Sequence, residues 1–148
     1  MIKGISGLFR VLVGLTAVFS LLTAGAADAT PAFSVRKEIC KIIQDKDIRT
    51  RTERASRLAM HLLNDKSGVS DSDIASLTAL LKDRDDSVRY YAAMSLGLIG
   101  DRARSAIPAL KIALAEIACI QLDKTSAPGI RLALTRLGSS PPDISCIG

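Results

Sequence analysis

The segment from Leu81 to Leu114 constrains the fold of this chain more than any other part of its sequence. Its apolar residues recur three or four positions apart, the spacing that places side chains on one face of an α-helix. They form two groups separated by a short turn: Val88, Tyr91, Ala92, Ser95, Leu96 and Ile99, then Ile107, Leu110, Leu114 and Ile117. Asp85 or Asp86 is suited to cap the first helix, Gly100 fits the left-handed position after it, and Pro108 is tolerated near the start of the second. The segment therefore predicts a helical hairpin.

The same segment resembles the HEAT-like repeats first associated with phycobilin lyases. Those repeats consist of an acidic turn, then V-R-x-x-A-A-x-x-L-G, a short turn, and A-I-P-x-L. The matching residues here are Asp83, Asp86, Val88, Arg89, Ala92, Ala93, Leu96, Gly97, Ala106, Ile107, Pro108 and Leu110. The resemblance implies a right-handed stack of antiparallel helix pairs that binds other proteins or, in one subfamily, handles a tetrapyrrole.

Weaker copies of the motif flank this segment. Arg54–Met60 aligns with Ala92–Leu98 at an offset of 38, and Ala133–Gly138 aligns with Ala92–Gly97 at an offset of 41. Both offsets are close to the length of a HEAT unit, about 40–47 residues. The copies depart from the pattern, because the first lacks the Val-Arg pair and has Ala59 in place of the glycine, and the third has Gly129-Ile130 in place of Val-Arg.

We therefore expect an all-α fold, a short right-handed α-solenoid of about three HEAT-like helix pairs over residues 30–138. A helix over 34–45, with Val35, Ile39, Ile42 and Ile43, is expected to cap its N-terminal end. The capping-box pattern at Ser70–Asp73 predicts the start of another helix, and Thr125 or Ser126 with Pro128 predicts the start of the last. Two prolines in the tail of residues 139–148 stop any further helix.

Composition agrees with helix packing. The sequence is 48% hydrophobic but only 3% aromatic, with no Trp. Such a core is built from Leu, Ile and Ala, which suit helices better than a sandwich or barrel. With one His and three Cys, the chain also has little material for side-chain catalysis.

Residues 1–29 have the pattern of a secretory signal peptide. Lys3 and Arg10 form a basic start, an apolar run covers 11–24, and cleavage could follow Ala26 or Ala29. The alternative, a retained transmembrane helix, needs a run of about 20 apolar residues, and the run over 11–24 is shorter than that. No Cys follows the run where a lipid anchor would attach. We therefore expect a periplasmic protein without a stable membrane anchor.

Cleavage after Ala29 would lower the formal net charge from +5 to +4. This mildly basic balance fits an acidic protein partner or an anionic envelope surface. Nucleic acid is not an expected partner, because the charges are dispersed and the protein is expected to be exported.

The cysteines allow a disulfide in an oxidising compartment. A bond between Cys119 and Cys146 would pin the tail and is worth about 3 kcal/mol for a loop of this size. Pairing of Cys40 with either is the alternative, because spacing does not fix connectivity. An unpaired Cys40, between Ile39 and Ile42, is expected to be a buried small hydrophobe.

No pattern of catalytic or metal-binding residues stands out. His61 lies in a predicted helix and is expected at the surface or rim, and the three Cys and one His have spacings too wide and irregular for a zinc site. The acidic run from Asp83 to Asp86 is explained by N-capping and the helix dipole. We therefore expect no enzyme activity, cofactor or metal.

Partner contacts are expected from exposed side chains of the repeat. Arg89 is expected to pair with acidic turn residues of the neighbouring unit, the alternative being direct recognition of a partner. Tyr91 is expected to pack inside and Tyr90, its neighbour, to point outward as a binding hot spot. The candidate partner-binding residues are Tyr90, Arg84, Arg104, Lys111 and Gln121.

The leading hypothesis is a non-enzymatic, exported protein that binds and occludes another protein. Its concrete form is an immunity protein against a peptidoglycan-cleaving amidase toxin delivered by type VI secretion; the resemblance to such antidotes rests on no shared motif. A periplasmic adaptor or assembly scaffold for envelope proteins is the second hypothesis. The third is a chromophore lyase-like enzyme, suggested by the repeat subfamily.

Overall fold

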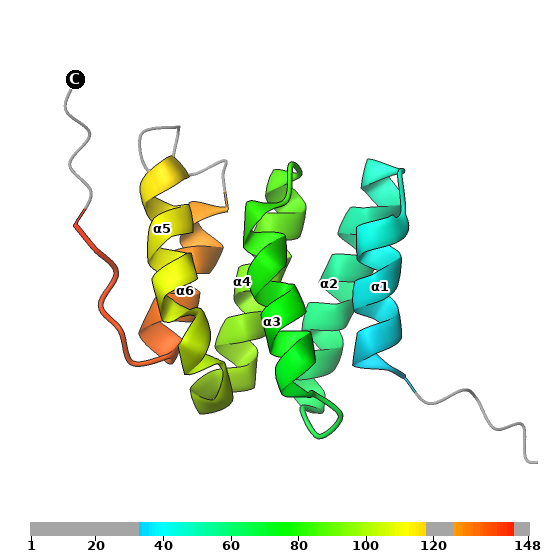
Figure 1. Cartoon of the computed structure of the whole chain (residues 1–148), viewed down its shortest axis with the longest axis horizontal. Coiled ribbons are helices and arrows are strands. Elements are labelled where there is room, and N and C mark those ends of the chain that lie inside the picture. Colours follow the sequence, from blue (N-terminus) through cyan, green and yellow to red (C-terminus); the bar gives the residue numbers. More distant parts are fainter. Residues whose placement is uncertain (1–32, 118–125, 144–148) are drawn as a thin grey trace, which may run out of the picture. The chain divides into compact units, whose positions relative to one another are not determined.

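The structure is a computed structural model that describes residues 33–117 and 126–143, and its regular elements in these ranges are all helices. They are α1 (Val35–Gln44), α2 (Ile48–Asn64), α3 (Asp71–Ala79), η1 (Leu80–Lys82), α4 (Asp86–Ile99), η2 (Gly100–Ala106), α5 (Ile107–Ile117) and α6 (Ala127–Arg136), where η marks a 3₁₀-helix (Figure 1). The predicted all-α class is therefore confirmed for the described residues. The signal peptide predicted over 1–29 lies outside them. Among the helices described, none has the length and apolar character needed to cross a membrane.

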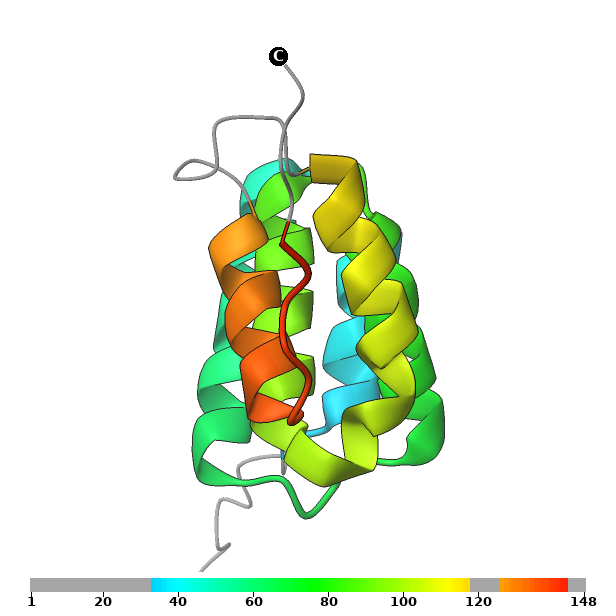
Figure 2. The ribbon, with the colours of Figure 1, turned by 90° about the vertical axis from the view of Figure 1, so that its left-hand side faces the viewer.

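The helices lie in two layers, between which the chain alternates. α1, α3 and α5 form one layer and α2, α4 and α6 the other (Figure 1). Figure 2 looks along the rows, with α5 and α6 nearest the viewer in separate layers. Within the second layer, α4 contacts α2 on one side and α6 on the other, and it also packs on α3. α4, the helix of the best-matching repeat, is thus the central element.

Side-chain caps fix where the helices begin. The Asp47 carboxylate accepts a hydrogen bond from the Thr50 N–H (2.8 Å), and Asp85 accepts one from the Ser87 N–H (3.1 Å). Ser70 and Asp73 form the predicted capping box at the start of α3. Ser126 occupies the cap position of α6 without a side-chain cap hydrogen bond, and Pro128 follows in the first turn. The predicted helix starts at Ser70, Asp85 and Ser126 are therefore confirmed.

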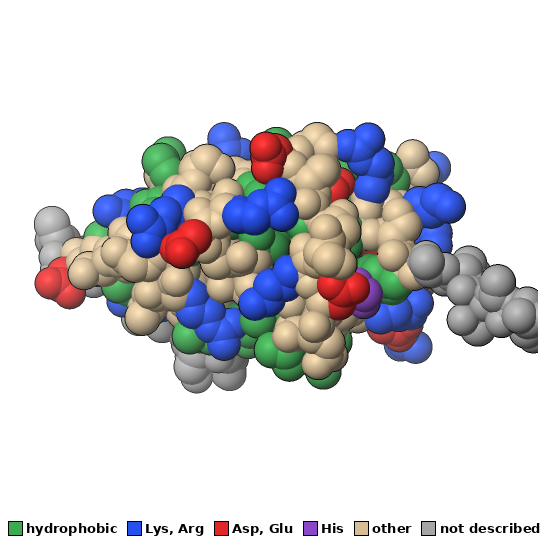
Figure 3. Space-filling model, turned by 90° about the horizontal axis from the view of Figure 1, so that it is seen from below, with side chains coloured by type: hydrophobic (Ala, Val, Ile, Leu, Met, Phe, Trp, Pro, Cys, Tyr) green, Lys and Arg blue, Asp and Glu red, His purple; other side chains and the backbone are tan. Residues whose placement is uncertain are grey.

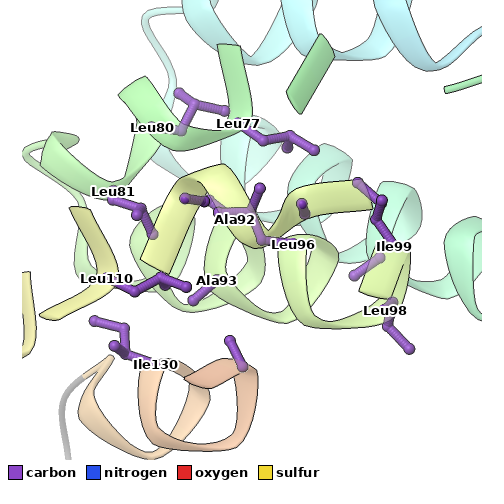
Figure 4. Close-up of a cluster of buried hydrophobic side chains, with 14 of the residues drawn as sticks. Leu77, Leu80, Leu81, Ala92, Ala93, Leu96, Leu98, Ile99, Leu110 and Ile130 are labelled. Carbon is purple, nitrogen blue, oxygen red and sulfur yellow. The ribbon is translucent and has the colours of Figure 1, made fainter. Parts of the chain in front are cut away.

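Leu, Ile and Ala fill the interior between the two layers. Figure 4 shows side chains of α3, η1, α5 and α6 gathered around Ala92, Ala93 and Leu96 of α4. Tyr91 and Phe33 pack against this core but are only partly buried. The few aromatic residues are thus at its margin, as the composition suggests.

α4 and α6 approach so closely that glycine is required between them. A Cβ atom added to Gly97 would lie 2.9 Å from the Cα of Ala133, closer than real Cβ contacts allow. Gly100 ends α4 with φ 76° and ψ −143°. Its φ is positive as predicted, but its ψ is not that of the left-handed helix, since the chain turns directly into η2.

The prediction that Cys40 is buried is wrong, because Cys40 is exposed. The buried face of α1 consists of Val35, Glu38, Ile39 and Ile42. Cys40 follows Ile39 by one residue and so points about 100° away from it around the helix. Ile43 is likewise 55% exposed, although the sequence placed it on the apolar face.

Candidate interaction surface

A polar network joins the N-terminal ends of α2, α4 and α6. Arg51, in the first turn of α2, is only 5% exposed and donates from Nε to the Ile42 carbonyl at 3.0 Å. Its Nη2 forms a salt bridge with Asp83, in the turn before α4. Thr52 donates to Asp85 (3.4 Å), and Ser126 donates to Asp86 (3.0 Å). Adjacent helices of the second layer are therefore tied together at one end.

Sequence reasoning missed the central member of this network. Arg51 precedes Arg89 by 38 residues, the offset of the first repeat, so the first copy carries an arginine where we expected none. The preceding turns match as well. Asp45 accepts from the Asp47 N–H (3.0 Å), as Asp83 accepts from the Asp85 N–H (2.9 Å). The Asp-x-Asp spacing that the two turns share is the sequence signal from which the role of Arg51 could have been predicted.

Arg89 forms the expected ion pair with the acidic turn at Asp83–Asp86, but this turn belongs to its own repeat and not to a neighbouring one. It forms a salt bridge with Asp86 and donates to the Asp83 carbonyl (2.7 Å), so its partners belong to its own turn. The pairing with a neighbouring unit is made instead by Arg51 and Asp83. Asp83 can serve both arginines because its carboxylate faces one and its backbone carbonyl the other.

Hydrogen bonds lower the pKa of two capping carboxyls. The N–H and hydroxyl of Thr50 hold the pKa of Asp47 below its usual range. Burial acts to raise the pKa of Asp73, but hydrogen bonds from Ser70, with the nearby Arg36, outweigh it and lower the pKa. Both caps therefore remain charged in mildly acidic solution.

The predicted partner-binding residues do not converge on one surface. Arg84 and Arg104 lie beyond opposite ends of α4, a helix of 14 residues, which separates them by about 20 Å. Lys111 is exposed on α5, in the other layer, and Gln121 lies outside the described residues. Arg104 pairs with Asp101 at 3.0 Å. Figure 3 shows the end of the molecule that carries η2, where basic side chains are dispersed among acidic and neutral ones.

Tyr90 is not the freely exposed residue that we expected. Its side chain is partly buried, and a Cβ added to Gly129 of α6 would lie 2.7 Å from its Cδ2 atom. Its ring also meets that of Tyr91 edge to face, with centroids 5.2 Å apart. α6 packs on the side of α4 that carries Tyr90, so much of the ring serves helix packing. Gly129 takes the place of the motif's valine, which leaves room for this ring.

The predicted cysteine and histidine features have different outcomes. Cys119 and Cys146, the disulfide candidates, lie outside the described residues. His61 is partly exposed, as expected, and stacks on Phe33 with centroids 3.9 Å apart. In residues 33–117 and 126–143, no group of three or more His, Cys, Asp or Glu side chains could hold a metal ion.

A hollow of about 330 Å³ lies between η1, α4 and α5. Its charged lining residues are Lys82, Asp83, Arg89 and Glu116. Asp83 and Arg89 already belong to the polar network, and the two signs balance. A second hollow, also about 330 Å³, is formed by Thr135 and residues 138–141. Leu81, Ala113 and Ile117 complete the lining of the first hollow, whereas Pro141 is the one apolar side chain among the lining residues of the second.

The side of the second layer that faces away from the core has a different character. It exposes two apolar residues of α2, Met60 (60%) and Leu63 (55%), and Leu132 of α6 (40%). Met94 of α4 is partly buried between them, and Arg57 and Arg136 are exposed beside them. We call this surface the outer face, defined by Arg57, Met60, Leu63, Tyr90, Met94, Leu132 and Arg136, of which Tyr90 is also partly buried.

Comparison of the chain with protein-family models, with curated proteins and with solved structures found no match.

Proposed function

We propose that this chain is a periplasmic protein-binding module built as a short right-handed α-solenoid of about three HEAT-like helix pairs. The cap positions of α2, α4 and α6 are Asp47, Asp85 and Ser126, which follow one another at offsets of 38 and 41. These are the offsets found by aligning the sequence with itself. Equivalent repeat positions thus begin three helices that lie side by side, as stacked units would require. This is the observation that carries the proposal.

The polar network supports a binding role because it makes the row of helices stiff. Arg51 to Asp83 and Ser126 to Asp86 connect neighbouring helices through side chains, in addition to apolar packing. A surface already held in its bound shape loses little conformational entropy when a partner docks. Stacked helix pairs offer broad surfaces of this kind.

In its concrete form, the module is an immunity protein. It binds a peptidoglycan amidase toxin delivered by type VI secretion and blocks access of the cell wall to the toxin's active-site cleft. The inhibition is steric and requires no chemistry from this chain. Export by the signal peptide over 1–29 would place it in the compartment where such a toxin acts.

The test is a pull-down with the mature chain from periplasmic extract, together with purified products of the genes adjacent to its own. Each product is first assayed for release of peptide stems from peptidoglycan sacculi. We expect one amidase to bind and to lose its activity on stoichiometric addition of the chain. An amidase that binds but stays fully active would contradict the proposed mechanism.

A periplasmic adaptor is the second candidate, and the difference between the two layers favours it. The exposed cations of α1 and α5 include Lys37, Lys41 and Lys111, whereas α2, α4 and α6 contain Arg and no Lys. Two chemically different surfaces could hold two different partners. Recovery of two envelope proteins that bind weakly and remain active would favour this function.

A further inference from the structure

The outer face of α2, α4 and α6 has the composition of a protein-binding surface. Its exposed apolar side chains are Met60, Leu63 and Leu132, and Tyr90 and Met94 of α4 are partly buried between the flanking helices. Tyr, Met and Arg are enriched at protein interfaces, whereas Lys, Glu and Asp are depleted. From this composition, and resting on the function proposed above, we propose that the amidase binds here, through an apolar patch bordered by carboxylates.

Charge on the outer face is available to a partner. Within the described residues, no salt bridge uses Arg57, Arg136 or the nearby Arg49. Arg57 lies one turn before Met60 on α2, and Arg136 lies one turn after Leu132 on α6. The nearby acidic residue on this side of α2 is Glu53. Three arginines without ion pairs around an apolar centre favour carboxylates on the partner, which arginine can bind in a bidentate manner.

The opposite layer lacks these properties. The exposed surface of α3 carries small residues, Ser72, Ala75 and Ala79, which offer no anchor for a partner. Ile43 of α1 and Ile112 of α5 are each 55% exposed, but α3 lies between their helices. On the outer face, by contrast, Met60 and Leu63 are one turn apart on the same helix.

Close packing also prepares the outer face for binding. The contact of Gly97 with Ala133 and that of Gly129 with Tyr90 fix the spacing between α4 and α6. Tyr90 is consequently held in place, so its remaining exposed surface is a rigid anchor. Tyrosine in such a setting is a typical hot-spot residue.

Two other occupants fit this face less well. In a two-fold dimer of this chain the face would meet itself, which would bring three arginines against three others with only Glu53 to offset them. An anionic membrane attracts Lys and Arg alike, so it would not prefer this face to α1, which exposes Lys37 and Lys41. A folded protein with an acidic rim is the better match.

The test uses two double variants of the full mature chain with the same change in net charge. Arg57→Glu/Arg136→Glu reverses the outer face, and Lys37→Glu/Lys82→Glu reverses exposed charges of the other layer, on α1 and on η1 after α3. None of these four side chains forms a salt bridge within the described residues. Both variants are therefore expected to fold, which thermal unfolding followed by circular dichroism checks.

The probe is the amidase identified by the pull-down above, and the measurement is its Kd for each chain by calorimetry. We expect the arginine variant to bind about 100-fold more weakly, roughly tenfold for each reversed charge, and the lysine variant to bind within about threefold of the unmodified chain. Equal weakening by both variants, or weakening by the lysine variant alone, would overturn the assignment of the surface while the proposed function stands.

The remaining outcomes also decide what binds to the outer face. Absence of amidase binding by the unmodified chain would overturn the proposed function and, with it, this assignment. Sedimentation of the unmodified chain as a dimer that the arginine variant abolishes would identify a second copy as the occupant and overturn the proposal. Membrane contact is tested by flotation with phosphatidylglycerol vesicles. If the arginine variant floats as well as the unmodified chain and the lysine variant does not float, any membrane contact lies on the other layer. The outer face is then left to the amidase. Loss of flotation by the arginine variant alone would assign the outer face to lipid instead.

Discussion

The salt bridge between Arg51 and Asp83 predicts a large loss of stability from one small substitution. Asp83→Asn keeps the size of the side chain and its oxygen, which still accepts from the Asp85 N–H. The change removes the negative charge and replaces Oδ2, the acceptor of Arg51, by an amide NH2 group, which is a donor. The Arg51 guanidinium, 6% exposed, then keeps its hydrogen bond to the Ile42 carbonyl but loses its counter-charge.

The expected cost follows from burial of the pair, whose side chains are 6% and 10% exposed. Breaking a buried ion pair while its partner charge remains typically costs 3–5 kcal/mol, and we take about 3 kcal/mol because Arg51 keeps its hydrogen bond to the Ile42 carbonyl. For a domain of this size, that lowers Tm by about 12–20 °C. Chemical denaturation gives the free energy of unfolding, and a thermal melt gives Tm.

Two further variants separate this explanation from its rivals. Asp71→Asn removes a carboxylate that is 95% exposed and bridged to Arg102, so no measurable change in Tm is expected. Adding Arg51→Met to Asp83→Asn should recover part of the lost stability, since no unpaired charge then remains buried. A free energy of unfolding for Asp83→Asn within about 0.5 kcal/mol of the unmodified chain would refute the reasoning.

Three other substitutions test the packing and the caps. Gly97→Ala should destabilise the chain by about 1–3 kcal/mol, because the added Cβ meets the Ala133 backbone. Gly68→Ala, with open space around it, should leave Tm nearly unchanged. An equal Tm for the two variants would refute the close approach of α4 and α6. Ser95→Ala should raise the free energy of unfolding by about 1 kcal/mol, because the buried hydroxyl has no hydrogen-bond partner; a loss of that size would show that the hydroxyl is satisfied. The lowered pKa of Asp73 means that its contribution is present above the unfolded-state value, near 3.8, and is lost as pH falls through the folded value. Acid titration of stability below about pH 5 should therefore be less steep for Asp73→Asn than for the unmodified chain, and equal slopes would contradict this.

Features that depend on local sequence were predicted well. The starts of α3, α4 and α6 follow from capping residues and the few positions after them, so Ser70, Asp85 and Ser126 could be identified without knowledge of the tertiary fold. The apolar faces of α4 and α5 likewise follow from spacing along one helix. The spacing of apolar residues nevertheless predicts only coarsely which way each side chain points, as the exposure of Cys40 and Ile43 on α1 demonstrates.

Features that depend on neighbouring helices were not predicted. Tyr90 reads as an outward residue of α4, and only the arrival of α6 with Gly129 partly buries it. Arg51 reads as one of several polar residues of α2, yet its partner lies 32 residues away in another turn. The outer face was missed for the same reason, because Met60, Met94 and Leu132 come from three helices whose order in the layer the sequence does not state.

Inhibition of the amidase by this chain is tested most sharply by titrating the enzyme's activity with the chain. Purified enzyme is held at a fixed concentration on peptidoglycan sacculi while the mature chain is added in increments. We expect activity to fall linearly to zero at a fixed molar ratio, and the Arg57→Glu/Arg136→Glu chain to miss this end point at the same concentration. Full amidase activity in a large excess of the unmodified chain would show that the chain is not an inhibitor of this enzyme.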